Sequence, residues 1–123
     1  MSRGPLPTQL CLLSDLPSKS PGDKVRFLGC VQNYSTATAC LTLTHGFPEG
    51  TEARALVDVT LLLENLTAEH TRVGEWVNIT GYISSPKSPL TDGHVPIQAL
   101  LLWSAGPLDL QRYERSLVAM KAG

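Results

Sequence analysis

The sequence has few aromatic residues and no long hydrophobic run, and the second of these shortages excludes a membrane-spanning helix. Only 6% of the 123 residues are aromatic, and the apolar stretch 99–103 is far shorter than the ~20 residues of a membrane-spanning helix. The apolar run 10–13 is too short for a signal peptide, so we expect an intracellular protein. With 42% hydrophobic and 17% charged residues, the composition predicts one soluble globular domain.

Cysteine is also scarce, and the three cysteines show no Cys-x-x-Cys spacing. Neither a disulfide framework nor a zinc site is indicated, because the number is odd and a reducing compartment keeps thiols free. We expect Cys11, Cys30 and Cys40 to be buried thiols, although Cys30 and Cys40 could face each other across a hairpin. No metal and no cofactor are expected.

Motifs for catalysis are missing: there is no Gly-x-Ser-x-Gly, no phosphate-binding glycine loop and no His-Glu-x-x-His. His45, His70 and His94 are isolated in predicted loops or loop edges, which favours solvated imidazoles. Cys40 and His45 could be imagined as nucleophile and base, but one lies inside a predicted strand and the other lies beyond its end. We therefore predict that the chain is not an enzyme.

A basic excess is absent, since 10 Lys and Arg face 11 Asp and Glu for a net charge of -1. The charge is uneven: residues 1–45 carry +2, residues 46–78 carry -4 and the remainder carries +1. Proteins that hold nucleic acid unaided usually have a clear basic excess, because counterion release supplies much of the affinity. We expect this chain to bind nucleic acid weakly by itself.

What the sequence does contain is a series of short segments with alternating polarity. Strands are predicted at 24–34, 39–44, 54–60, 73–83 and 95–103. A short helix or turn is predicted at 61–70, and a final helix follows Gly106-Pro107 and covers 108–120. Gly29 and Gly81 lie inside the first and fourth strands, where glycine indicates a bulge or sharp bend.

This order predicts an all-β fold with appended helices, a five-stranded Greek-key OB-fold barrel with a C-terminal α-helix. SH3-like barrels also have five strands, but they usually lack a helical segment before the fourth. We expect an N-terminal strap or short helix at residues 1–23, the barrel at 24–104 and the helix at 105–123. The apolar anchors of the strap are Leu10, Leu12, Leu13 and Leu16.

The fifth predicted strand is apolar on both faces. One set is Ile97, Ala99, Leu101 and Trp103, and the other is Leu100 and Leu102. Since only one face of a barrel strand points inward, Leu100 and Leu102 should lie under a cover outside the barrel, and the final helix is the natural one.

The final helix carries an apolar stripe at helical spacing. The stripe consists of Leu110, Tyr113, Leu117 and Met120. These side chains could simply pack on their own barrel. However, Leu108 and Val118 lie away from the stripe, which favours a second contact with a partner protein, with Arg112 and Arg115 as its polar rim.

Cationic and aromatic side chains on the outward faces of the first and fourth strands are candidates for contacting nucleic acid, because OB barrels bind single strands with such groups. The candidates are Lys24, Arg26, Tyr34 and Tyr82. Trp76 and Tyr82 could equally pack under the final helix or the strap, whereas Phe27 and Trp103 are expected in the core. A bulge would exchange the faces.

The segments 24–34, 38–44, 57–66 and 73–82 together resemble the fungal Ten subunit family of the CST (Ctc/Cdc–Stn–Ten) telomere-capping complex. The likeness runs from about residue 8 to the last helix. It implies a single OB fold that binds the N-terminal OB domain of the Stn subunit, similar to the small and middle subunits of replication protein A. It further implies a nuclear complex at the chromosome telomere, with a Ctc/Cdc-type large subunit, that holds single-stranded telomeric DNA and assists lagging-strand fill-in by polymerase alpha-primase.

Our hypothesis is a non-enzymatic subunit that pairs through its last helix and the adjoining barrel wall and contributes weakly to single-strand binding. The predicted partner interface comprises Leu100, Leu102, Leu110, Tyr113, Leu117 and Met120. The alternative is a free-standing OB-fold protein that binds single-stranded DNA or RNA. The role of the loop at 84–94 stays open.

Overall fold

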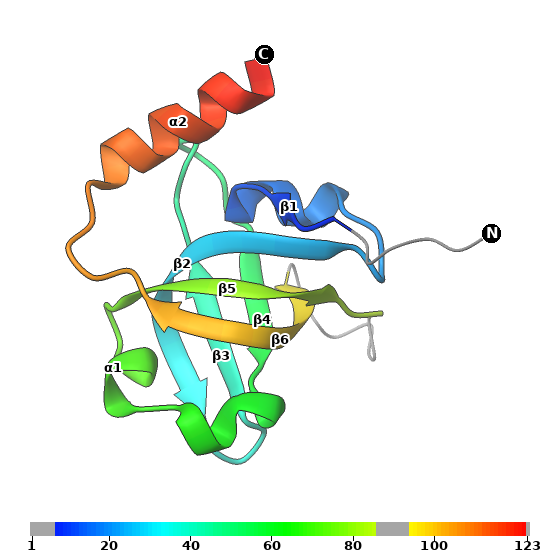
Figure 1. The fold of residues 1–123 in the computed structure, drawn as a ribbon, viewed down its shortest axis with the longest axis vertical. Helices are drawn as coiled ribbons and strands as arrows, with labels where there is room; N and C mark the ends of the chain where they lie inside the picture. The colour runs from blue at the N-terminus through cyan, green and yellow to red at the C-terminus, as the bar shows by residue number, and fades with distance from the viewer. Residues whose placement is uncertain (1–6, 86–93, 123) are drawn as a thin grey trace.

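A computed structural model describes residues 7–85 and 94–122 (Figure 1). Its strands are β1 (Gln9–Leu10), β2 (Lys24–Ser35), β3 (Cys40–Thr44), β4 (Arg54–Asp58), β5 (Trp76–Ile83) and β6 (His94–Ser104). Its helical segments are η1 (Leu13–Ser18), η2 (Thr60–Asn65), α1 (Ala68–Thr71) and α2 (Leu110–Ala122). Residues 1–6 of the predicted strap and most of the 84–94 loop lie outside the described residues.

The barrel closes because β2 pairs along both of its halves. Its first half is antiparallel to β5 and its second half is antiparallel to β3. The sheet order is β1-β2-β3-β4-β6-β5, in which β4 and β6 are parallel and the short β1 runs parallel to β2. The five longer strands form the predicted Greek-key barrel with a helix after the last strand, so the predicted fold class is confirmed.

Glycine allows two close approaches of the backbone in this barrel. A Cβ on Gly29 would lie 2.8 Å from the Cβ of Leu43 on β3, where β2 bends across the barrel. A Cβ on Gly81 would overlap the carbonyl oxygen of Gln98 on β6, beside a shift in the β5–β6 register. Both glycines therefore serve the bend and the bulge that their positions predict.

The register shift turns the second half of β6 over. Thr80 is opposite Leu101, whereas its neighbour Gly81 is opposite Ala99, so Leu100 is the extra residue of a bulge. As a result Leu102 packs against the core and Leu101 points outward with 58% of its surface exposed. The prediction that Leu102 faces away from the barrel, under the final helix, is wrong for this reason.

A second bulge lies in β2, where the register with β3 shifts between Val31 and Asn33. Before the bulge, Val25 and Phe27 point inward as predicted and are fully buried. After it, Tyr34 is turned toward the core and is half-buried against it. Tyr34 therefore does not lie on the same face as the outward residues of the first half.

The described part of the N-terminal segment covers one end of the barrel. Leu13 and Leu16 of η1 belong to the core cluster, together with the inward residues of the five longer strands. Leu12 is buried too but lies outside that cluster. Leu10, by contrast, remains exposed on β1, so three of the four predicted apolar anchors are buried.

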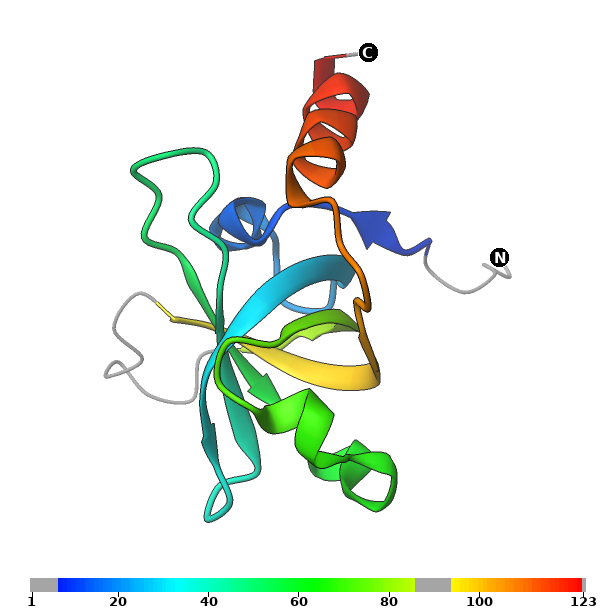
Figure 2. The same ribbon diagram turned by 90° about the vertical axis from the view of Figure 1, so that its left-hand side faces the viewer.

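Helix α2 lies beyond the end of the barrel that carries β1 and η1, while η2 and α1 lie at the opposite end (Figures 1 and 2). It crosses β1 and β2 rather than β6. Among the described residues, no helix has the length and apolar character needed to cross a membrane.

Candidate partner and nucleic-acid interfaces

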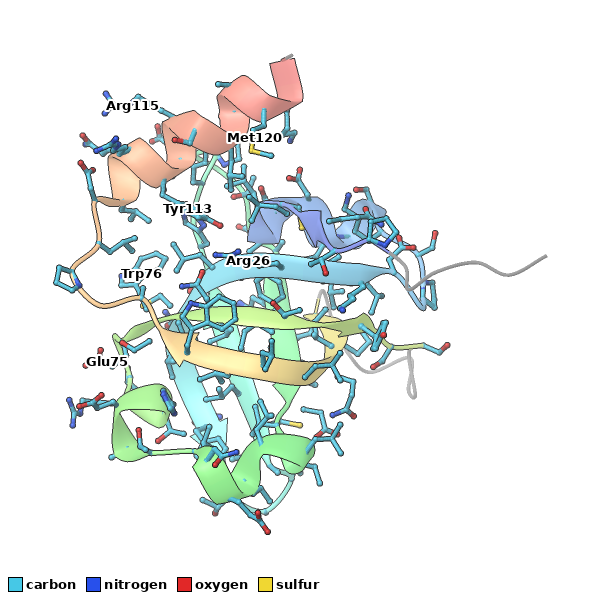
Figure 3. The ribbon with its side chains drawn as sticks, in the orientation of Figure 1. Arg26, Glu75, Trp76, Tyr113, Arg115 and Met120 are labelled. Carbon is cyan, nitrogen blue, oxygen red and sulfur yellow. The ribbon has the colours of Figure 1, made fainter. Side chains whose placement is uncertain are left out.

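The inner face of α2 rests on its own chain. Leu117 is buried, and Leu110 and Tyr113 are half-buried. Leu12 and Leu28 are buried outside the core cluster, and Tyr113 points down from the helix toward β2 (Figure 3). These side chains form a second, smaller apolar layer between α2 and the outer face of β2.

A buried hydrogen bond ties α2 to the loop after β3. The Nε2 atom of His45 lies 2.6 Å from Oε2 of Glu114, and only 3% of His45 is exposed. The imidazole meets the ring of Trp76 edge-on at 5.3 Å between centroids and stacks on Phe47 at 6.1 Å. The prediction of a solvated His45 is wrong, because its partner on α2 is 69 residues away in the chain.

Burial also changes the acidity of two groups beneath α2. It raises the pKa of the Tyr113 hydroxyl to about 12, although the charge of Arg26 and the backbone of Leu28 act in the opposite direction. It likewise raises the pKa of the Cys11 thiol to about 11. Both groups are therefore neutral at physiological pH and serve packing rather than chemistry.

At the helix end, Lys121 forms a more exposed ion pair with Asp15, with an Nζ to Oδ1 distance of 2.7 Å.

The remaining thiols do not pair with each other. Cys40 is opposite Ser35 and Cys30 is opposite Thr44, at the two ends of the β2–β3 hairpin. Both are half-buried, so of the three predicted buried thiols only Cys11 is fully buried, and all three are free. Within residues 7–85 and 94–122 there is no group of side chains that could hold a metal ion.

The flanks of α2 remain apolar and exposed. Val118 is 46% exposed on one flank and Met120 is 58% exposed on the other, while the small residues Ser116 and Ala119 lie between them on the outer side. Met120 also lines a groove of about 140 Å³. The other lining residues are Leu10, Cys11, Leu12, Asp15, Leu117 and Lys121.

The predicted interface residues are thus divided by the structure. Leu117 is buried within the chain itself, and Leu110 and Tyr113 face the barrel, whereas Met120 lies at the open flank of α2. Leu100 and Leu102 are half-buried on β6, and Leu102 lines a groove beside η2. Helix α2 does not cover these two residues.

Three of the four candidate nucleic-acid residues lie close together on the outer face of β2 and β5. Lys24 pairs across the strands with Tyr82, and Arg26 is two residues further along β2. The guanidinium of Arg26, labelled in Figure 3, lies on β2. It is 5.1 Å from the ring centroid of Trp103 on β6, a cation–π contact between the two strands. Tyr34, at the far end of β2, is not part of this group.

Trp103 and Glu114 are the residues that the sequence analysis missed. Trp103 was expected in the core, but the bulge at Leu100 places it on the outer face beside Asn78. The signal that could have revealed this is Gly81, since a glycine inside a strand often accompanies a bulge in its neighbour. Nothing in the local sequence around Glu114 indicates its contact with His45.

Comparisons with known proteins agree with this geometry. The family model Ten1, described as "Telomere capping, CST complex subunit", matches residues 1–118. The chain belongs to the Ten1 family. A curated member, the ten1 protein of Schizosaccharomyces pombe, is 32% identical over 107 residues, which is 87% of each chain.

Solved structures show the same fold for the Ten1 family. The chain matches a crystal structure of the S. pombe Stn1–Ten1 complex with a TM-score of 0.74 and 28% identity, covering 97% of this chain and 96% of the other. A replication protein A heterotrimer bound to single-stranded DNA shares the fold alone, with a TM-score of 0.61 and 11% identity over 94% of this chain and 95% of the other. The chain is therefore an OB-fold telomere-capping subunit of the CST complex and not an enzyme.

Proposed function

We propose that this Ten1-family chain forms a heterodimer with the N-terminal OB domain of a Stn-type subunit, through the outer side of α2 and the groove beside β1. The observation that carries this proposal is the exposure of Val118 and Met120 on a helix whose inner face is already occupied. The similar S. pombe chain forms a complex with Stn1, which supports a partner of the same kind here.

The outer side of α2 suits a partner helix. Ser116 and Ala119 would allow a second helix to approach closely, and Val118 and Met120 would contact it on both sides. Burial of each apolar side chain contributes about 1.5–3 kcal/mol before entropic costs. Arg112 and Arg115 are exposed and lie on the same outer side, each four residues before Ser116 or Ala119, where they would make polar contacts with the partner.

The proposal is tested by replacing Val118 and Met120 together with aspartate and measuring co-purification with the Stn-type subunit. We expect the double variant to lose the complex while its thermal unfolding stays close to that of the wild type, because both residues are exposed. The matched control is Leu61→Asp with Leu63→Asp, which makes the same type of change at the opposite end of the barrel. A complex that survives the first pair of substitutions would remove α2 from the interface.

We also propose that the chain contributes weakly to binding single-stranded telomeric DNA through Lys24, Arg26 and Tyr82. Their position on one face supports this, since a cationic pair beside an exposed aromatic ring can hold a phosphate and stack a base. Tyr34 is left out of the proposed contact because it packs against the core.

The DNA contact is tested on the heterodimer by filter binding at two salt concentrations. Lys24→Glu with Arg26→Glu should weaken binding severalfold, whereas the same change at the exposed Arg54 should have little effect. Tight, salt-sensitive binding by the isolated chain would instead favour the alternative of a free-standing protein that binds single-stranded DNA or RNA.

We further propose that the chain acts in the nucleus at chromosome telomeres, in a complex with a Ctc/Cdc-type large subunit. In that complex it would assist lagging-strand fill-in by polymerase alpha-primase. The family description as a telomere-capping CST subunit supports this setting. Depletion of the chain should therefore lengthen the single-stranded telomeric overhang, and an unchanged overhang would contradict a role in fill-in.

A further inference from the structure

A second exposed apolar surface lies at the end of the barrel opposite to α2 (Figures 1 and 2). Leu61 and Leu63 of η2 are 65% and 47% exposed, and Leu101 of the adjacent β6 is 58% exposed. We call these three residues the η2 surface. The partner contact and the DNA contact proposed above use other residues, although Leu101 lies in the same cross-strand row as Arg26 of the DNA contact.

Leu101 of the η2 surface lines a groove with an apolar floor, and Leu62, the neighbour of both Leu61 and Leu63, lines it too. The volume of the groove is about 110 Å³, enough for one aliphatic side chain. The other lining residues are Asn65, Leu66, His70 and Leu102. Because Leu62, Leu66 and Leu102 pack against the barrel core, the floor of the groove is fixed by the fold.

The charges around the η2 surface are of one sign. Residues 58–75 contain four carboxylates and one arginine, Arg72, which is paired with Glu75 at 3.3 Å. Asp58, Glu64 and Glu69 form no ion pair within the described part of the chain. The local formal charge is -3 in a chain whose total is -1, so the acidity is concentrated here.

We propose that the η2 surface docks a basic amphipathic helix of another protein, with aliphatic side chains over Leu61, Leu63 and Leu101 and cationic side chains opposite Glu64 and Glu69. The carboxylates repel the phosphates of nucleic acid, so nucleic acid is excluded as the molecule that binds this surface. They also oppose pairing with a second copy, because a two-fold contact would bring identical acidic rims together. Since α2 lies at the other end of the barrel, both surfaces can be occupied at once.

The proposal is tested with the full chain, labelled with ¹⁵N, and a synthetic helical peptide of about 18 residues, or five helical turns. The peptide carries leucines on one face and lysines on both sides of that face, and a twin peptide carries glutamates in place of the lysines. We expect the lysine peptide to shift the amide resonances of residues 60–70 and 101–102 and to bind at least about tenfold more tightly than its twin, a preference that salt should reduce.

Variants of the chain separate the apolar contribution from the charge contribution. Leu61→Asp with Leu63→Asp should weaken the lysine peptide about tenfold or more, whereas Val73→Asp, at an exposed residue that is not part of the η2 surface, should not. Glu64→Lys with Glu69→Lys should reverse the preference, so that the glutamate peptide binds more tightly.

Three results would overturn the proposal. They are resonance shifts that fall elsewhere on the barrel, equal or absent binding of the two peptides, and self-association of the chain that the Leu61→Asp, Leu63→Asp variant abolishes. The last result would assign the η2 surface to a second copy of this chain.

Discussion

The hydrogen bond between His45 and Glu114 joins the loop after β3 to α2, and both side chains are shielded from solvent because α2 packs there. Replacing Glu114 with alanine would leave His45 buried with no partner on either ring nitrogen among the described residues. We expect a loss of about 1–3 kcal/mol in the free energy of unfolding, the usual cost of orphaning a buried polar group. Urea denaturation measures it, with the exposed Arg115→Ala on the same helix as the control. Equal stability of the two variants would mean that His45 gains water when Glu114 is lost.

Gly81 provides a second test at a single residue. A methyl group there would overlap the carbonyl oxygen of Gln98 and lie 3.0 Å from the Cα of Ala99, both part of the backbone of β6. Because neither atom can rotate away, Gly81→Ala should destabilise the protein by about 1–3 kcal/mol. Gly46→Ala is the matched control, since a methyl group at Gly46 meets nothing within 4 Å. Thermal unfolding compares the two variants. If Gly81→Ala unfolds at the same temperature as the control, the bulge can relax to accommodate the methyl group.

Prediction from sequence succeeded for residues whose environment is determined by their neighbours in the chain. The alternation of Val25 and Phe27 correctly places both inside the barrel, because the spacing of two residues in a strand is local. His45 could not be predicted in this way, since its burial depends on Phe47 nearby but also on Trp76 and Glu114, which only the folded chain brings close.

The packing of helix α2 on the barrel buries two groups, Tyr113 and Cys11, that must stay protonated. The stability of the folded state should therefore depend on pH. The folded-state pKa values of Tyr113, about 12, and Cys11, about 11, are raised above their ordinary values of about 10 and 8.5. A raised pKa favours the protonated form in the folded state, so this stability is fully present below the ordinary value and is lost as pH rises through the folded value. We therefore expect the urea midpoint to fall between about pH 9 and pH 12.

The contribution of Tyr113 can be isolated by substitution with phenylalanine. Tyr113→Phe should remove the upper part of the pH dependence, because phenylalanine has no hydroxyl that can ionise beneath the helix. Tyr82→Phe, at an exposed ring, is the control and should leave the profile unchanged. A fall in the urea midpoint that persists unchanged in Tyr113→Phe would assign the alkaline transition to other groups.

The strands and helices were easier to predict than the faces they present. All five barrel strands were predicted to within a few residues, because alternation and glycine or proline boundaries are local signals. The bulges in β2 and β6 each insert one residue, and from that point every later side chain changes face. This single cause explains why Tyr34 and Leu102 face the core, whereas the position of α2 away from Leu100 depends on the folded chain.

Across the whole molecule, two exposed apolar surfaces lie at opposite ends of the barrel, and the charged residues beside them differ in sign. The end with α2 has Arg112 and Arg115 at its rim, and the end with η2 has Glu64 and Glu69. A partner of the α2 end would need acidic residues, and a partner of the η2 end would need basic ones. Each end therefore disfavours the partner of the other. A barrel occupied at both of these proposed surfaces would hold two neighbours in a fixed arrangement.

This arrangement predicts that the two ends act independently. We expect the pair Val118→Asp and Met120→Asp to abolish the Stn-type heterodimer without changing the affinity for the basic helical peptide, and Leu61→Asp with Leu63→Asp to do the reverse. In the isolated chain, the effects of the two pairs on unfolding free energy should add to within about 0.3–0.5 kcal/mol, because no residue of one pair contacts the other. Calorimetry measures the affinity for the peptide, and urea denaturation measures the free energy of unfolding. Both are applied to the wild type, to each double variant and to the variant that combines them. A larger coupling would mean that the barrel transmits strain between its ends, and the two surfaces would then have to be treated as one cooperative site.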